Sequence, residues 1–206
     1  MSTPAQRMVA EQLQPNGVTD ERVLKVMSEI PREEFLPGRV RRHAYENRAL
    51  AIDCGQTISQ PLVVALMTQV ARPQPEDRAL EIGAGTGYQA AVLSRLVASV
   101  VTVELEPALA EHASATLRRL GFDNVEVAVA DGSQGWPSGA PYDVILVAAA
   151  SPDVPPALLE QLSPRGRLVI PLGSAMDEHQ DLRLYERVGE EMTWRSLFPV
   201  RFVPLR

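Results

Sequence analysis

The sequence predicts an α/β fold: a doubly wound, mostly parallel sheet with an antiparallel C-terminal edge and a helical N-terminal extension. From residue 78 onward, short β-branched runs alternate regularly with helix-like segments. A glycine-rich segment at 83–87 directly follows the first of these runs. Residues 1–76 instead are typical of a helical region with connecting loops. Because parallel strands are joined by crossover helices, the alternation indicates a parallel sheet with helices on both faces.

The N-terminal region begins with a predicted helix. Capping-type residues at 19–21 start it, and Pro31 ends it. Residues 38–60 show no clear periodicity. A second helix begins at Pro61, which suits the first helical position, and its apolar side chains recur every four residues from Leu62.

The second part of the chain supplies the strands and helices of the sheet. We expect core strands at 78–82, 99–103, 125–130, 142–148 and 167–171. We expect helices at 88–97, 107–120 and 156–161. Two strand-like pieces close together, 182–188 and 193–203, predict the antiparallel edge.

Composition limits the function classes. The 206 residues predict one domain over 1–206, divided into a helical region at 1–76 and an α/β core at 77–206. With 20 basic and 26 acidic residues the net charge is −6, which argues against a nucleic-acid partner. The single cysteine excludes an intramolecular disulfide, and three histidines without metal-ligand spacing predict no metal.

The longest apolar run, Val144–Ala150, is far shorter than the ~18 residues of a membrane span. Without a signal-peptide pattern, we expect a cytoplasmic location.

The strongest local motif is the segment LEIGAGTGY at 80–88. Glycines between a strand and a helix let the backbone turn sharply and let a ligand approach closely. The spacing is G-x-G-x-G, it contains no lysine of the kind that a P-loop needs, and Glu81 precedes the first glycine. The alternative is a tight turn that binds nothing. The candidate binding residues are Glu81, Gly83, Ala84, Gly85, Thr86 and Gly87.

Two later strand ends carry acidic residues. Glu104 ends the second strand, where nucleotide-binding folds place a carboxylate that accepts hydrogen bonds from a ribose diol. Asp131 and Gly132 follow the third strand and are candidates for the adenine edge. The alternatives are a solvated charge at Glu104 and an Asx-type turn at Asp131.

A third motif is GQTISQP at 55–61, in which Ser59 stands just ahead of the helix that begins at Pro61. The free N–H groups at a helix N-terminus favour a bound anion, so a carboxylate substrate is one candidate ligand. The alternative, which the local sequence favours, is that Ser59 merely caps the helix.

Together these motifs resemble the protein-L-isoaspartate (D-aspartate) O-methyltransferase family over nearly the whole chain. The segments that carry the resemblance are 31–35, 55–61, 80–89, 131–136, 141–143, 148–149, 169–173 and 201–205. The glycine motif is shared by many methyltransferases, whereas QTISQP at 56–61 and VPL at 203–205 are more specific to this family. Departures from the family pattern are Cys54, Ser151 and a slightly long loop at 174–180.

The resemblance implies a Rossmann-like class I methyltransferase fold and S-adenosyl-L-methionine as cofactor, with S-adenosyl-L-homocysteine as product. It implies methylation of the free carboxylate of L-isoaspartyl and D-aspartyl residues in damaged proteins, which starts repair through a succinimide. It makes Ser59 the active-site serine and places residues 1–76 on the substrate side. The implied substrate-binding residues are Gln56, Thr57, Ile58, Ser59 and Val203. The implied cofactor-binding residues are those of the glycine motif with Glu104, Leu105, Asp131 and Gly132.

Three other functions are compatible with parts of the sequence. An NAD-dependent oxidoreductase uses a similar glycine loop, but the G-x-G-x-G spacing and the lack of room for a substrate domain disfavour it. A different methyltransferase, acting on RNA or on a small molecule, is the second alternative, and the net charge of −6 disfavours RNA. A non-catalytic cofactor-binding module is disfavoured by the complete 56–61 segment. We expect a monomer that acts on isoaspartyl proteins and peptides.

Overall fold

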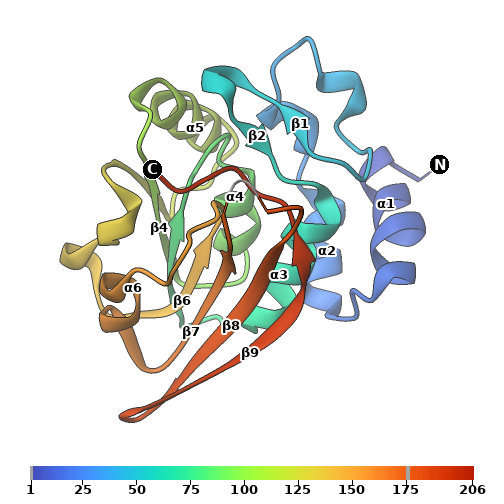
Figure 1. Cartoon of the computed structure of the whole chain (residues 1–206). Helices are drawn as coiled ribbons and strands as arrows, with labels where there is room; N and C mark the ends of the chain where they lie inside the picture. The colour runs from blue at the N-terminus through green and yellow to red at the C-terminus, as the bar shows by residue number, and fades with distance from the viewer. Residues whose placement is uncertain (1, 175–176) are drawn as a thin grey trace.

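The structure, a computed structural model, describes residues 2–174 and 177–206. A seven-stranded sheet with the order β5-β4-β3-β6-β7-β8-β9 forms its centre, and a two-stranded sheet, β1-β2, lies beside it (Figure 1). The long loop expected at 174–180 includes residues 175–176, which lie outside the described residues. No helix in the described ranges is both long and apolar enough to cross a membrane.

The helices and strands from α2 onward follow the predicted order, except for the unpredicted strands β1 and β2; helix α1 is also unpredicted. The helices are α1 (Pro4–Met8), α2 (Glu21–Glu29), α3 (Pro61–Ala71), α4 (Tyr88–Ser94), α5 (Pro107–Arg119) and α6 (Pro156–Glu160). The strands are β1 (Leu50–Ala51), β2 (Thr57–Ile58), β3 (Arg78–Ile82), β4 (Ser99–Glu104), β5 (Val125–Val129), β6 (Tyr142–Val147), β7 (Leu162–Leu172), β8 (Gln180–Val188) and β9 (Glu191–Val200). A short 3-10 turn, η3 (Arg32–Phe35), connects α2 to the loops that follow.

The sheet is parallel over its first five strands and antiparallel at one edge. β3 pairs in parallel with β4 on one side and with β6 on the other. β7 pairs with β8, and β8 with β9, in antiparallel fashion. These pairings confirm the predicted fold class. Because the direction of winding reverses at β3, a crevice is expected outside the carboxyl ends of β3, β4 and β6.

The core has two parts, one on each face of the sheet. Val144 and Leu146 of β6 belong to the part that α2, α3, α4 and α5 cover. Ile145 and Val147, which alternate with them, belong to the second part, where Leu158 of α6 packs. Successive strand residues point to opposite faces, so this near-continuous apolar run is buried on both sides.

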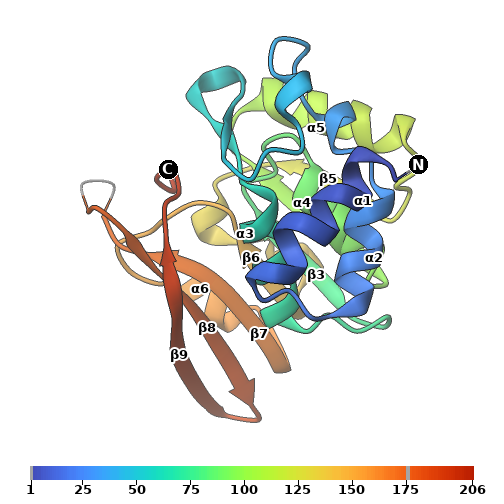
Figure 2. The ribbon, with the colours of Figure 1, turned by 90° about the vertical axis from the view of Figure 1, so that its right-hand side faces the viewer.

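The N-terminal helices and the C-terminal hairpin lie on different sides of the molecule. In Figure 2 the blue helices α1 and α2 pack beside α3 and α4, while β8 and β9 extend away from them. Thr3 and Gln6 form a reciprocal capping box that starts α1. Asp20 caps α2 by accepting a hydrogen bond from the Arg22 amide, as the 19–21 signal predicts.

Helix α4 ends three residues earlier than the sequence predicts. The periodic apolar run continues to Val97, but the helix stops at Ser94. The Asn124 side-chain amide donates to the Ser94 carbonyl at 2.9 Å and to the Ala98 carbonyl at 3.2 Å. A distant side chain therefore satisfies carbonyl groups that the local sequence leaves free, and Val97 is buried outside the helix.

Strand β9 is also shorter than predicted at its C-terminal end. It stops at Val200, and the chain then turns toward the carboxyl edge of the sheet. The side chain of buried Gln180 holds this turn through two hydrogen bonds with the main chain of Phe202. The Phe202 N–H donates to Oε1 of Gln180 at 2.7 Å, and Nε2 of Gln180 donates to the Phe202 carbonyl at 3.3 Å. This contact takes residues 201–203 out of the sheet and brings them to the crevice.

Candidate active site

The glycine segment forms the loop between β3 and α4. The amides of Gly83 and Ala84 donate to the Val103 carbonyl at 2.8 and 3.2 Å. The amide of Gly85 donates to the Glu104 carboxylate at 2.8 Å. The loop is therefore held against the end of the neighbouring strand β4.

Glu104 supports two segments at once. Its second carboxylate oxygen accepts a hydrogen bond from the Glu106 amide at 3.0 Å, and the residue is only 7% exposed. A carboxylate offers about four acceptor positions, so two remain for a ligand. Glu104 is thus both a clamp on the glycine loop and a wall of the cavity beside it.

Glu81 is the most unusual titratable group in the site. It is fully buried, and burial raises the pKa of its carboxyl to about 8, with a further increase from the charge of Glu104. Thr102 offsets part of this shift by donating a hydrogen bond to one carboxyl oxygen at 2.5 Å. The other oxygen, Oε1, has no hydrogen-bond partner within the described residues. A buried unpaired carboxyl oxygen at a cavity is an acceptor available to a ligand.

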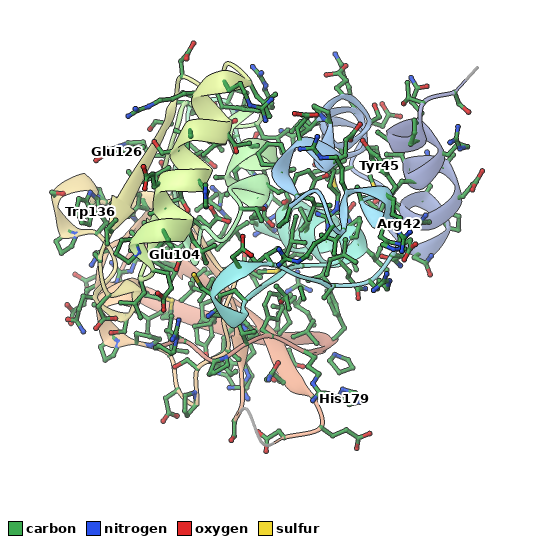
Figure 3. All side chains as sticks on the ribbon, turned by 90° about the horizontal axis from the view of Figure 1, so that it is seen from above. Arg42, Tyr45, Glu104, Glu126, Trp136 and His179 are labelled. Carbon is green, nitrogen blue, oxygen red and sulfur yellow. The ribbon has the colours of Figure 1, made fainter. Side chains whose placement is uncertain are left out.

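Three adjoining cavities open along the carboxyl edge of the sheet. Figure 3 views this edge from above and labels Glu104 and His179, which line the first and the second cavity. The first lies between the ends of β3, β4 and β6. It is lined by Gln56, Thr57, Ile82, Gly83, Gly85, Val103, Glu104, Leu105, Gly132, Ala148, Ala149 and residues 203–206. Its lining includes eight of the predicted site residues.

The second cavity is a more apolar groove between α3 and the end of β9. It is lined by Ala49, Thr57, Ser59, Gln60, Leu62, Val63, Leu66, His179 and residues 198–203. The third cavity lies under the glycine loop and adds Ile58, Glu81, Ala84, Thr86 and Tyr88. Thr57 lines all three cavities, Ser59 lines the groove and the third cavity, and Val203 lines the first cavity and the groove.

The structure excludes one of the two roles that the sequence leaves open for Ser59, that of a helix cap. The N-cap of α3 is Gln60, and no side chain of the cap residue bonds to the helix. The first free amide, that of Leu62, donates to the Asn47 side chain at 3.3 Å. Ser59 therefore does not cap α3, and its hydroxyl makes no hydrogen bond within the described residues. It remains free for a ligand.

The same contacts weaken the idea that the helix terminus itself holds an anion. Pro61 has no N–H, and the amides of Val63 and Val64 donate to the Gln60 carbonyl at 3.1 and 3.2 Å. With Leu62 paired to Asn47, the first turn of α3 offers no unpaired amide. An anion in the groove depends on side-chain donors such as the Ser59 hydroxyl.

A hairpin that the sequence does not predict carries the serine segment. Strand β2 pairs with β1, Thr57 opposite Ala51 and Ile58 opposite Leu50. Exposed Cys54 stands in the connecting turn with a left-handed φ of 56°. Buried Ile58 anchors the segment to the core, so the side chains on either side of it face the cavities.

The remaining predicted residues lie at the rim or behind the loop. Exposed Asp131 accepts a hydrogen bond from the Ser133 amide at 2.8 Å, which is the Asx-type turn that the sequence left open as the alternative to an adenine contact. Gly132 lines the first cavity, where a Cβ would lie 2.3 Å from Ile82. Gly87, with a φ of 85°, packs against α5, where a Cβ would lie 3.1 Å from Leu117. It lines none of the three cavities. Its role is close helix packing.

Several lining residues are not among the sequence-predicted site residues. They are Ala148 and Ala149 after β6, Pro204, Leu205 and Arg206 at the end of the chain, and the groove residues His179, Phe198 and Phe202. The small size of Ala148 and Ala149, directly after a predicted strand, is a sequence signal for a close approach. In the structure Ala148 lies 3.6 Å from the position that a Cβ on Gly83 would take. His179 and Phe198 give none, because only the tertiary fold brings them to α3. Within residues 2–174 and 177–206, no cluster of side chains is suited to hold a metal ion.

The strand order, the clamped glycine loop and the crevice beside it define a class I methyltransferase. The sequence model of the protein-L-isoaspartate(D-aspartate) O-methyltransferase family matches residues 4–206. The chain therefore belongs to this family, as the resemblance implies, and it is an enzyme of this class.

Individual relatives agree with this assignment. A protein-L-isoaspartate O-methyltransferase of Roseiflexus castenholzii is 52% identical over 203 residues, 98% of this chain and 92% of the relative. A solved protein-L-isoaspartate O-methyltransferase structure superposes with a TM-score of 0.86 at 33% identity, covering 97% of this chain and 65% of that longer chain. A Plasmodium falciparum structure, described as a complex with S-adenosyl-L-homocysteine, has the same fold at 23% identity, with a TM-score of 0.84 over 98% of both chains.

Proposed function

We propose that this chain transfers a methyl group from S-adenosyl-L-methionine to the free carboxylate of L-isoaspartyl and D-aspartyl residues in damaged proteins and peptides. The observation that carries the proposal is the position of Thr57 and Ser59, where the cavity at the glycine loop adjoins the groove along α3. A donor molecule on one side and a peptide on the other would meet at these two residues. Family membership and the names of relatives about 50% identical support the same activity.

The first and third cavities suit the cofactor. Bound there, S-adenosyl-L-methionine supplies a reactive methyl group on a positively charged sulfur. The unpaired oxygen of Glu81 and the remaining acceptor positions of Glu104 fit a ligand that carries positive charge and a ribose diol. We assign cofactor binding to Glu81, Gly83, Ala84, Gly85, Thr86, Glu104, Leu105 and Gly132, which line these two cavities, and to Asp131 beside Gly132, with Gly87 shaping the loop from behind.

The groove suits an extended peptide with a carboxylate at Ser59. We assign substrate binding to Gln56, Thr57, Ile58, Ser59 and Val203. A side-chain carboxylate has an ordinary pKa near ~4, so it is ionised at pH 7 and needs no general base. The task of the protein is to align the acceptor and to exclude water, and such orientation contributes roughly 7–11 kcal/mol to a reaction.

In this mechanism Ser59 orients the substrate and does not attack it. Its unpaired hydroxyl donates a hydrogen bond to one oxygen of the substrate carboxylate, and such a bond to a charged group contributes about 1.5–3 kcal/mol. Apolar groove residues, among them Leu62, Val63 and Phe198, keep water away from the carboxylate. A backbone amide nitrogen of the substrate then attacks the methyl ester and expels methanol, which closes a succinimide without help from the chain, so no hydrolytic residue is required.

The decisive experiment compares two peptides that differ only in an isoaspartyl or a normal aspartyl residue. We expect radioactive methyl transfer to the isoaspartyl peptide alone. Equal labelling of the two peptides would reject the assignment. Calorimetric titration with S-adenosyl-L-homocysteine and with NAD separates a methyltransferase from an oxidoreductase, and we expect binding of the former only.

We also propose that the chain acts as a monomer in the cytoplasm on proteins rather than nucleic acid. The net charge of −6 supports a protein substrate. We treat residues 1–206 as one domain whose 1–76 region forms one wall of the substrate groove, with residues 198–203 as the other wall. Size-exclusion chromatography with light scattering tests the oligomeric state.

A further inference from the structure

Arg32 is among the largest fully buried side chains of the described residues, it lines none of the three cavities, and it carries a charge. Its side chain is 0% exposed, and no carboxylate pairs with it within the described residues. Burying an unpaired guanidinium opposes folding, and burial lowers the pKa of Arg32 from its ordinary value. A group buried at such cost is expected to have specific partners.

The partners of Arg32 are main-chain carbonyls from two separate loops. Its Nε donates to the Ala44 carbonyl at 2.8 Å, and its Nη2 donates to the Ser59 carbonyl at 2.7 Å. The planar guanidinium presents its donors in a fixed fork, so the two carbonyls are held at a fixed separation. One of them belongs to the serine that we place at the reacting carboxylate.

The same guanidinium also contacts the cofactor side. It lies over the ring of Tyr88 at 4.6 Å from the ring centroid. Tyr88 is the first residue of α4, directly after the glycine loop, and it lines the third cavity. Phe35, one 3-10 turn after Arg32, packs edge-on against the same ring at 5.5 Å. The short turn η3 therefore holds α4 with two side chains.

We propose that Arg32 is a positioning residue for methyl transfer, which joins the Ser59 main chain to the start of α4 and so sets the distance between the acceptor and the glycine loop. The inference rests on the proposed role of the groove and the loop. Arg32 lines none of the three cavities. It acts through Ser59 and Tyr88, and an error of about 1 Å in such an alignment lowers rates about 100-fold.

The test compares two conservative arginine substitutions. Arg32→Lys keeps the charge but cannot hold both carbonyls in a rigid fork. Arg167→Lys is the control, because Arg167 is a largely enclosed arginine, 13% exposed, that bonds Asp77 at 2.6 Å and the Arg72 carbonyl at 2.8 Å, away from the three cavities. We expect Arg32→Lys to lower kcat about 10- to 100-fold while the Kd of S-adenosyl-L-homocysteine changes less than about threefold. We expect Arg167→Lys to leave kcat unchanged at a similar loss of Tm.

An equal loss of kcat in the two variants, or a loss in Arg32→Lys that appears only in cofactor affinity, would overturn the proposal. A measurement on the unaltered protein covers the case in which Arg32→Lys fails to fold. In nitrogen-15 and carbon-13 NMR we expect slow exchange of the Arg32 guanidinium protons and a coupling through the hydrogen bond to the Ser59 carbonyl. Rapid exchange of these protons with water would reject the contact. This readout needs no activity, so it remains decisive even if isoaspartyl peptides prove not to be the substrate.

Discussion

The Gly85 amide donates a hydrogen bond to the Glu104 carboxylate at 2.8 Å, so the middle of the glycine loop is fastened to the end of the neighbouring strand. The two residues are 19 positions apart in the chain. The same carboxylate accepts from the Glu106 amide and lines the first cavity. One side chain thus shapes the loop and takes part in the site that the loop encloses.

Glu104→Gln is expected to weaken cofactor binding without unfolding the protein. The amide has nearly the same shape, but its NH2 group faces a backbone N–H in place of an acceptor, and the charge is lost. Loss of one charge-assisted hydrogen bond costs about 1.5–3 kcal/mol, or roughly 10- to 150-fold in affinity. Calorimetry with S-adenosyl-L-homocysteine measures the change, and exposed Glu126→Gln on β5 is the control. An unchanged Kd would show that Glu104 has no part in binding.

Ser59→Ala is expected to reduce kcat roughly 10- to 150-fold at unchanged Tm. The hydroxyl makes no hydrogen bond within the described chain and does not cap α3, so its removal costs the fold little. Steady-state methylation of an isoaspartyl peptide measures kcat. Ser28→Ala, which removes a remote hydroxyl bonded to the Lys25 carbonyl, is the control with full activity. Wild-type turnover by Ser59→Ala would exclude the proposed role, and a covalent adduct on Ser59 would replace it with nucleophilic attack.

Glu81 is expected to make stability fall as pH rises. Its carboxyl has a pKa of about 8 in the folded protein against 4.5 as the ordinary value. Between these values the unfolded chain has lost the proton and the folded chain keeps it, so the free energy of unfolding decreases with rising pH. The stability that this group contributes is complete below pH 4.5 and lost above pH 8. Glu81→Gln should therefore flatten the pH dependence between pH 5.5 and 7.5, measured by urea unfolding, whereas Glu126→Gln should not. Parallel curves for Glu81→Gln and the wild type would contradict the raised pKa.

Cofactor binding is expected to release a proton at pH 7. A cationic ligand beside the unpaired Oε1 of Glu81 favours the ionised carboxylate and lowers its pKa. Calorimetry in two buffers of different ionisation enthalpy counts the protons released when S-adenosyl-L-methionine binds. We expect a release in the wild type and none in Glu81→Gln. Equal heats in both buffers for the wild type would mean that Glu81 does not meet the cation.

Gly132→Ala is expected to destabilise the protein and disturb the first cavity. The added Cβ would lie 2.3 Å from Cγ2 of Ile82, the last residue of β3, so either the Gly132 backbone or the Ile82 side chain must shift. Overpacking of this kind costs about 1–3 kcal/mol. Urea unfolding measures the loss, and Gly38→Ala, which meets no atom within 4 Å, is the control with unchanged stability. Equal stabilities of the two variants would show that the Gly132 turn is free to adjust.

Local sequence patterns anticipate most of the fold because they report local physics. The run at 142–148 is apolar on both faces, and β6 is buried on both faces. Local patterns do not predict where α4 ends, because Asn124, 30 residues after Ser94, donates a hydrogen bond to the Ser94 carbonyl at that end. The β1–β2 hairpin was missed because each of its strands has only two residues, too few for a periodic signal.

The sequence by itself determined the parallel sheet, the glycine loop, the acidic residues at two strand ends and the segment that contains Ser59, since each depends on residues adjacent in the chain. Only the tertiary structure decided how these parts are used. It frees the Ser59 hydroxyl by giving the first amide of α3 to Asn47, and it brings residues 198–203 across from α3 to complete the groove. It also buries Arg32 behind the serine. These outcomes depend on contacts between residues far apart in the chain, which no periodicity or motif spacing encodes.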